Sequence, residues 1–388
     1  MEISACVKYV GVNDHQVDLF EGQYKVPNGM SYNSYVILDD KITVMDTVDG
    51  FFTEEWMNNV EQVLDGKMPD YLVIQHMEPD HSASIPAFLK KYPKATVVST
   101  AKGFQFMEQF FPEFFAGQGL PAEQRIVAAN DGVLELGQHS LHFVYAPMVH
   151  WPEVMMTYEA TEKILFAADG FGKFGALDVE EEWTDEARRY YIGIVGKYGP
   201  QVQAVLKKAA GLDIQTICSL HGPVLKENLG FYLEKYDRWS SYQPEESGVV
   251  IAYASVYGNT RNAAEYLADV LQEKGQKTVL YDLSRCDKAK AVADAFRYDR
   301  LVLAGITYNG DLFPCMRSFI EGLTERNYQN RKVAIIENGT WAPMAGKLIL
   351  GMFEKSKNLT FTETTVSIKS AMNEQNKGEI EKLAEELC

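Results

Sequence analysis

The sequence is poor in paired cysteines. Its five cysteines are widely separated, and no two of them form a Cys-x-x-Cys pair. This spacing argues against a disulfide framework, a zinc ribbon and a thiolate-bound iron centre. We therefore expect free thiols at Cys6, Cys218, Cys286, Cys315 and Cys388.

Positive charge and long apolar runs are also scarce. The chain has 37 Lys and Arg against 54 Asp and Glu, a formal net charge of −17, so phosphate groups would be repelled. No apolar run approaches the roughly 20 residues that cross a bilayer, and the first residues lack the basic-then-apolar pattern of a signal peptide. We expect a cytoplasmic protein that binds neither nucleic acid nor membrane.

The 388 residues are too many for one ordinary core, which predicts two domains. Up to about residue 241, strands, helices and polar loops follow one another without a strict order, with one long helix predicted for 184–203. From Gly248 onward, strands and helices alternate strictly. The short polar segment 242–248 is the expected boundary, so we predict domains at residues 1–246 and 247–388.

The densest group of potential metal ligands lies at residues 75–81. This segment follows the apolar strand predicted for 71–74 and precedes a helix predicted for 82–90. It therefore forms a loop at the carboxyl end of a strand, and loops of this kind often carry function. Two imidazoles and two carboxylates within six residues are hard to explain as packing. The spacing suits two adjacent metals better than one, with His76, Glu78, Asp80 and His81 as the candidate ligands.

Three further candidate ligands each end a predicted strand. His150 lies between two prolines, Asp169 closes an apolar run, and His221 ends another strand. Asp169 alone could equally cap a turn. Taken together, these strand ends predict a metal site at one rim of a β-sandwich. The two histidines in the strand pair predicted for 132–146, His139 and His142, are expected on the sheet surface instead.

This ligand set resembles that of the metallo-β-lactamase-like half of the flavodiiron proteins, also called A-type flavoproteins. Zinc hydrolases of that superfamily have histidine where this chain has Glu78, and a carboxylate there favours iron over zinc. The resemblance implies an αββα sandwich, and family members differ in whether the imidazole at position 81 binds metal. It is carried by His-x-Glu-x-Asp-His at 76–81, His-Trp-Pro at 150–152, Asp169 and Leu-His-Gly-Pro at 220–223. By resemblance, His76, Glu78 and His150 bind one iron, Asp80, His81 and His221 bind the other, and Asp169 bridges them.

The second half is expected to form a parallel, doubly wound sheet of five strands that alternate with helices, and such sheets bind ligands at the carboxyl ends of their strands. The loop 255–260 offers hydroxyls, a glycine and free amides to a phosphate. The glycine-rich dinucleotide fingerprint is absent. The loops 307–311 and 338–343 add aromatic rings beside polar turns. The arrangement resembles flavodoxin and implies FMN bound by Ser255, Val256, Tyr257, Gly258, Asn259, Thr260, Thr307, Tyr308, Asn309, Gly310, Asn338, Gly339, Thr340 and Trp341.

Together the two halves resemble a flavodiiron oxidoreductase over nearly the whole chain. The resemblance implies that FMN passes electrons to a non-haem diiron centre, which reduces oxygen to water, nitric oxide to nitrous oxide, or both, and so protects an anaerobe from these gases. Since no rubredoxin-like or flavin-reductase extension is recognised, we expect a separate donor such as rubredoxin or a reduced deazaflavin. We also expect a head-to-tail homodimer or homotetramer.

Two other interpretations stay open. One is a hydrolase of the lactamase superfamily with a regulatory flavin domain, against which Glu78 argues. The other is an electron-transfer flavoprotein without enzymatic activity, against which the complete set of ligand positions argues.

Overall fold

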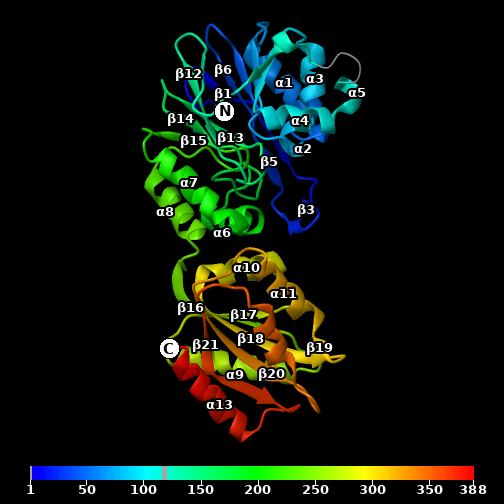
Figure 1. Cartoon of the computed structure of the whole chain (residues 1–388), viewed down its shortest axis with the longest axis vertical. Helices are drawn as coiled ribbons and strands as arrows, with labels where there is room; N and C mark the ends of the chain where they lie inside the picture. Colours follow the sequence, from blue (N-terminus) through cyan, green and yellow to red (C-terminus); the bar gives the residue numbers. More distant parts are fainter. Residues whose placement is uncertain (1, 116–119) are drawn as a thin grey trace. The chain divides into compact units, whose positions relative to one another are not determined.

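The computed structural model describes residues 2–115 and 120–388 (Figure 1). The chain divides into two compact units. The first contains the residues up to Tyr191 together with Pro200–Asp237, and the second contains Ile192–Gly199 and Arg238–Cys388. No helix among the described residues is long and apolar enough to cross a membrane.

The first sheet of the first unit has the strand order β1-β6-β7-β8-β9-β10. Strands β6 and β7 form an antiparallel hairpin, and β7 to β10 run parallel. The helices α1, α3, α4 and α5 lie together on one side of this unit (Figure 1). The bounds are β1 Val7–Tyr9, β6 Tyr35–Ile37, β7 Thr43–Met45, β8 Tyr71–Val73, β9 Thr96–Ser99 and β10 Arg125–Val127, with α1 Thr53–Leu64, α2 Pro79–Ser82, α3 Ile85–Lys91, α4 Ala101–Phe110 and α5 Pro112–Phe115. Two small ribbons pair β2 Val12–Asp14 with β5 Met30–Tyr32, and β3 Leu19–Phe20 with β4 Tyr24–Lys25.

The second sheet has the order β11-β12-β13-β14-β15. Its inward side chains pack against those of the first sheet: Tyr35 and Val73 from the first share one buried core with Phe143 and Phe166 from the second. This packing confirms the predicted αββα sandwich. The bounds are β11 Val133–Glu135, β12 Ser140–Tyr145, β13 Met155–Glu159, β14 Ile164–Phe166 and β15 Thr216–Cys218, with α6 Trp183–Tyr190, α7 Gly199–Ala209 and α8 Leu229–Ser240.

The second unit is a parallel sheet of order β17-β16-β18-β20-β21, with the short β19 added antiparallel to β18. Helices α9 and α13 share one buried core with the facing side chains of β16, β18, β20 and β21. The predicted flavodoxin-like sheet is therefore confirmed. The bounds are β16 Glu246–Tyr253, β17 Thr278–Asp282, β18 Tyr298–Tyr308, β19 Asp311–Leu312, β20 Arg331–Asn338 and β21 Leu359–Ile368, with α9 Asn259–Glu273, α10 Lys288–Arg297, α11 Pro314–Thr324, α12 Ala345–Met352 and α13 Glu374–Glu386.

The single helix predicted for 184–203 is wrong. Helix α6 ends at Tyr190, a π-helical turn covers Tyr191–Val195, a 3-10 turn covers Gly196–Tyr198, and α7 then begins at Gly199. Glycine lowers helix stability, and Pro200 has no amide hydrogen to continue an incoming helix but fits the first turn of a new one. The helix α12 and the short β19 were not predicted.

Candidate metal centre and flavin site

Pro79 divides the ligand loop into two differently shaped parts. Helix α2 begins at this proline, and Glu78 before it has extended backbone angles. Glu78 therefore lies on extended chain and His76 lies outside any helix, whereas Asp80 and His81 lie in the first helical turn. The change of backbone direction lets one short segment supply ligands to two neighbouring groups.

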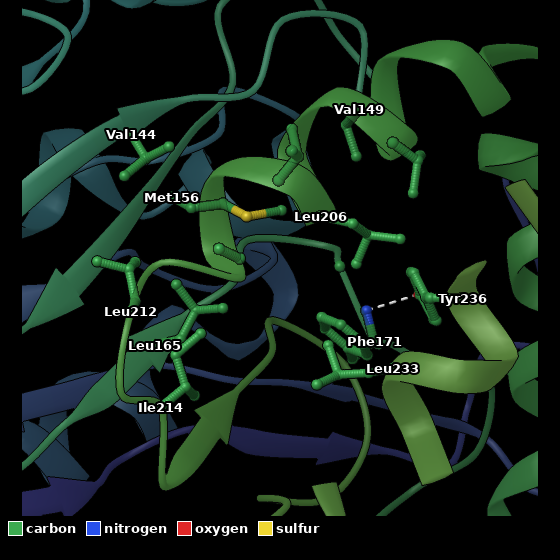
Figure 2. A pocket seen from close by; sticks show the side chains of 14 residues that line it. Val144, Val149, Met156, Leu165, Phe171, Leu206, Leu212, Ile214, Leu233 and Tyr236 are labelled. Atoms are coloured by element: carbon green, nitrogen blue, oxygen red, sulfur yellow. Dashed lines mark hydrogen bonds between the residues drawn. The ribbon is translucent and has the colours of Figure 1, made fainter. Parts of the chain in front are cut away.

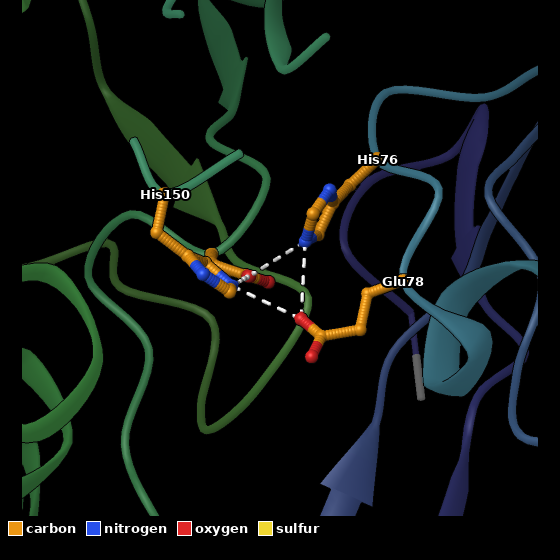
Figure 3. A group of neighbouring side chains, drawn as sticks. His76, Glu78 and His150 are labelled. Atoms are coloured by element: carbon orange, nitrogen blue, oxygen red, sulfur yellow. Dashed lines mark hydrogen bonds and ion pairs between the residues drawn. The ribbon is translucent and has the colours of Figure 1, made fainter. Parts of the chain in front are cut away.

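The first group consists of His76, Glu78, His150 and Asp169, whose ligand atoms all lie within 4.8 Å of one another. The His150 Nε2 atom is 3.0 Å from Glu78 Oε2 and 3.0 Å from Asp169 Oδ2. The His76 Nε2 atom is 3.2 Å from Glu78 Oε2 and 3.3 Å from Asp169 Oδ2. Figure 3 shows His76, Glu78 and His150 pointing toward a common centre.

The second group consists of Asp80, His81 and His221. The Nε2 atoms of His81 and His221 are 3.1 Å apart, and each is 3.2 Å from Asp80 Oδ2. The other carboxylate oxygen of Asp169, Oδ1, is 3.3 Å from His81 Nε2. Asp169 therefore presents one oxygen to each group. The structure brings together all seven ligands predicted from the sequence.

The donor atoms of these groups fit bound cations. Both carboxylate oxygens of Asp80 and of Asp169 are buried without a hydrogen-bond partner anywhere in the described chain. Burying such oxygens unpaired is costly, and metal coordination removes that cost. The set contains imidazole nitrogens and carboxylate oxygens but no thiolate, which suits non-haem iron.

The electrostatics keep the carboxylates ionised. Burial alone would raise the pKa of Asp169, but the charge of His76 and the close imidazoles of His150 and His81 hold that pKa well below its usual range. Burial of His76 would lower its pKa. The neighbouring carboxylates of Asp169, Glu153 and Glu78 outweigh this effect and raise the pKa well above its usual value. The ionised carboxylates thus attract positive charge, which protons on the imidazoles or bound metal ions can supply.

Residues that the sequence analysis missed hold the ligands in place. Glu153 Oε1 is 2.8 Å from His76 Nδ1 and accepts the Met77 amide at 2.9 Å. The Asp46 carboxylate accepts the Gln75 amide at 2.7 Å and its side-chain Nε2 at 2.9 Å. The Ser31 carbonyl, 2.7 Å away, accepts a hydrogen bond from His221 Nδ1. The only sequence signals were that Glu153 shares the loop of His150 and that Asp46 ends a strand.

His81 differs from these two histidines in its second nitrogen. The His81 Nδ1 atom is buried and has no hydrogen-bond partner within residues 2–115 and 120–388. Metal-bound histidines usually donate that second hydrogen to a carboxylate or carbonyl. The ring of His81 is therefore less firmly oriented than those of His76 and His221.

The expectation that His139 lies on the sheet surface is wrong. This side chain is buried in the turn between β11 and β12, with Nδ1 2.8 Å from Asp39 Oδ2. The alternating pattern placed it on a strand, but the strand begins only at Ser140. His142 does lie on β12, half-buried, with Nε2 3.2 Å from the Ser140 hydroxyl.

An apolar cavity of about 30 Å³ lies between α7, α8 and the strands β12, β13 and β14 (Figure 2). Its wall includes Val149, which precedes the ligand His150, and Gly170 and Phe171, which follow the ligand Asp169. The Tyr236 hydroxyl at the edge of the cavity already accepts a hydrogen bond from the Phe171 amide at 2.6 Å. A water molecule needs two to four polar partners, so this cavity favours an apolar occupant.

The three predicted flavin loops line one pocket of about 580 Å³ at the carboxyl ends of β16, β18 and β20. The amino end of α9 opens into it after Gly258, whose φ of 91° strains any residue with a side chain. Tyr257 and Trp341 are 93% and 90% exposed, which is unusual for rings of that size. A planar ring system would cover them. Every predicted flavin residue except Gly258 lines this pocket, together with Ile306, Ala342, Met344 and Ser370, which were not predicted.

Comparisons with known proteins identify both halves of the chain. A family model described as ODP family beta lactamase matches residues 30–222, and a flavodoxin domain model matches residues 250–359. The flavodiiron protein of Giardia intestinalis superimposes with a TM-score of 0.91 at 26% identity, over 100% of this chain and 96% of that one. The chain belongs to the flavodiiron protein family.

Other similar proteins also span most of the chain. The nitric oxide reductase of Moorella thermoacetica is 29% identical over 88% of this chain and 86% of its own length. The rubredoxin oxygen:oxidoreductase of Desulfovibrio gigas has a TM-score of 0.92 at 24% identity, over 100% of this chain and 97% of that one. Membership implies FMN and a non-haem diiron centre, and the donor atoms and the pocket described above fit both.

Proposed function

We propose that this flavodiiron protein takes electrons through FMN to a diiron centre and reduces oxygen to water, nitric oxide to nitrous oxide, or both. The observation that carries the proposal is Asp169, whose two carboxylate oxygens face two separate ligand groups. Its Oδ2 atom is 3.0 Å from His150 Nε2, and its Oδ1 atom is 3.3 Å from His81 Nε2. When bound, two adjacent irons and FMN supply the redox chemistry that protein side chains lack.

We assign the ligands as the family resemblance implies. His76, Glu78 and His150 would hold one iron, Asp80, His81 and His221 would hold the other, and Asp169 would serve both. The assignment is supported by the division of these residues into two groups, with Asp169 counted in the first and reaching the second. Glu153 keeps Nε2 of His76 directed at the metal by engaging its Nδ1 atom.

The FMN site is assigned to the pocket in the second unit. The phosphate would lie at the amino end of α9 on Ser255 to Thr260, and the ring would lie among Tyr257, Tyr308 and Trp341. We accordingly propose that residues 1–246 carry the metal centre and residues 247–388 carry the flavin.

The apolar cavity supports a gaseous substrate. Its wall contains no charged side chain and touches the segments that carry His150 and Asp169. Oxygen and nitric oxide are small and weakly polar, so they partition into such a space more readily than water does.

A dimer and a separate donor complete the proposal. Phe51 is 97% exposed. It lies two residues from Asp49, which is close enough to the proposed ligand Asp80 for that charge, together with burial, to raise the pKa of the Asp49 carboxyl. Exposed aromatic rings thus occur near the metal ligands and at the flavin pocket, as a head-to-tail pair would require. Rubredoxin or a reduced deazaflavin is the proposed donor, and the five unpaired cysteines support a cytoplasmic location.

The test is an anaerobic reoxidation experiment. The protein is fully reduced and mixed with oxygen or nitric oxide, and flavin reoxidation is timed. We expect fast reoxidation by at least one gas in the wild type and slow reoxidation in Asp169→Ala, which should lose iron but keep FMN. The matched control is Glu123→Ala, an exposed carboxylate remote from the ligand loops. Full turnover and iron content in Asp169→Ala would refute the bridging assignment.

A further inference from the structure

A second group of metal-ligating side chains lies at the end of the sandwich opposite the diiron ligands. Strand β7 leads to Asp46 and β14 leads to Asp169 at the ligand end. The turns that precede these strands, at 38–42 and 160–163, therefore lie at the other end, as does the turn 136–139 that opens β12. Cys6, immediately before β1, meets them there because its carbonyl accepts the Leu38 amide at 2.9 Å.

Three different ligand types converge at this end. The Cys6 thiol, a ring nitrogen of His139 and a carboxylate oxygen of Glu162 all lie within 4.8 Å of one another. His139 Nδ1 is taken by Asp39 Oδ2 at 2.8 Å, so Nε2 is the nitrogen that remains, 3.4 Å from Glu162 Oε1. Each ligand comes from a different segment of the chain.

Asp39 fixes the orientation of the central imidazole. Its Oδ2 accepts the backbone amide of His139 at 2.7 Å as well as engaging the ring, and both side chains are about 5% exposed or less. A carboxylate that holds the outer nitrogen of a histidine, while the inner nitrogen faces other ligands, is the usual support of a metal-bound histidine. This arrangement distinguishes the group from a chance surface cluster.

We propose that Cys6, His139 and Glu162 bind one zinc-type divalent cation, distinct from the two irons. Thiolate, imidazole and carboxylate are the three ligand types that zinc accepts, and the thiolate disfavours magnesium and calcium. Three protein ligands leave one position of a tetrahedral site for water, and the side chain of Glu162, 24% exposed, gives access to solvent.

The bound ion would clip the two sheets together. Cys6 precedes a strand of the first sheet, whereas His139 and Glu162 lie in turns of the second. The role is structural, because the strands separate this position from the diiron ligands.

The test uses the full-length protein loaded with iron and FMN, dialysed against zinc. We expect one zinc per chain beyond the two irons, with a sulfur scatterer at about 2.3 Å in zinc-edge X-ray absorption. Sulfur is diagnostic, because the proposed iron ligands include no cysteine. Zinc should also protect Cys6, but not Cys286, from alkylation as read by peptide mass spectrometry.

Matched variants decide the assignment. Cys6→Ser should weaken zinc binding at least tenfold and remove the sulfur signal, and Glu162→Gln should weaken it without disturbing the His139–Asp39 pair. Cys286→Ser should bind zinc as the wild type does, and all three should keep FMN, iron and gas reduction. The proposal is overturned if the wild type binds no more zinc than Cys6→Ser, or if the bound zinc has only nitrogen and oxygen neighbours.

Discussion

At the scale of single residues, the diiron site depends on groups that never touch the metal position. Glu153 is almost fully buried and binds both His76 Nδ1 and the Met77 amide through one oxygen. Asp46 is fully buried and locks Gln75, the residue before His76. His76 is therefore held by two carboxylates, one on its ring and one on the preceding residue, and neither belongs to the ligand motif at 76–81.

Replacing Glu153 tests this support. We expect Glu153→Ala to weaken iron binding about 10-fold to 100-fold, because His76 loses the partner that orients its ring. Glu153→Gln keeps an acceptor oxygen and should lose much less. Iron affinity is measured by competition with a chelator, with FMN content as the control. Equal affinity in the wild type and both variants would contradict the supporting role.

Asp46 should make stability depend on pH. Burial, partly offset by the hydrogen bonds from Gln75, raises the pKa of Asp46 from 3.8 to about 6. The folded state therefore holds the proton more tightly than the unfolded state. The protonated Asp46 carboxyl therefore stabilises the folded state fully below about pH 4, and this stabilisation is lost as the pH rises through 6. At about 1.4 kcal/mol per pKa unit, the loss in the free energy of unfolding is roughly 3 kcal/mol.

The Asp46→Asn variant should lack this dependence. It can keep both hydrogen bonds if the Gln75 amide turns over, since Gln75 Oε1 has no partner among the described residues. Thermal unfolding is measured for both proteins at pH 4 and pH 8. The unfolding temperature of the wild type, relative to that of the variant, should be higher at pH 4 than at pH 8. Glu123→Gln, at an exposed site, serves as the control. A difference between the two proteins that does not change with pH would refute the assignment.

At the scale of elements, most strands and helices could be predicted, because buried strands are apolar runs and α1 or α9 carry a clear helical period. The break between α6 and α7 could not, because Gly193, Gly196, Gly199 and Pro200 are spread over two turns and each of them alone is compatible with a weakened helix. His139 was misplaced because a one-residue error in the start of β12 turns a strand position into a buried turn. The seven proposed metal ligands could be predicted because each follows an apolar strand. Glu153 has no such pattern, and Asp46 ends a strand but lies outside the motifs that carry the family resemblance.

The apolar cavity belongs to α7 and the strands beneath it. Val202→Ile on α7 adds one methylene to this space, and burial of that group should raise the free energy of unfolding by up to about 0.8 kcal/mol. We expect xenon binding to be lost and gas reduction to need a higher gas concentration, while iron and FMN stay unchanged. Val127→Ile, on the exposed face of β10, is the control. Unchanged kcat/KM for the gas would separate the cavity from substrate access.

At the scale of the whole molecule, the proposed head-to-tail pair makes each active site depend on two chains. A variant without flavin, Gly258→Val, is mixed with a variant without iron, His76→Ala, under conditions of subunit exchange. Each alone should be inactive, because one cofactor is missing from every site. Heterodimers should regain roughly one working site per pair. A strictly monomeric wild type that reduces gas at full rate would refute the pairing.

The eight residues Ile192–Gly199 belong to the second unit although they are followed by more of the first. During synthesis on the ribosome, the first unit is complete once Asp237 has been added. At that stage Ile192–Gly199 has been made, but the rest of the second unit has not. The hydrogen bonds of this segment form only after residues 326 and 327 have been made. The Gly193 carbonyl accepts from Arg326 Nε at 3.1 Å, and the Lys197 carbonyl accepts from Asn327 Nδ2 at 2.8 Å. Assembly of the flavin-binding half is therefore tied to synthesis of the half that precedes it.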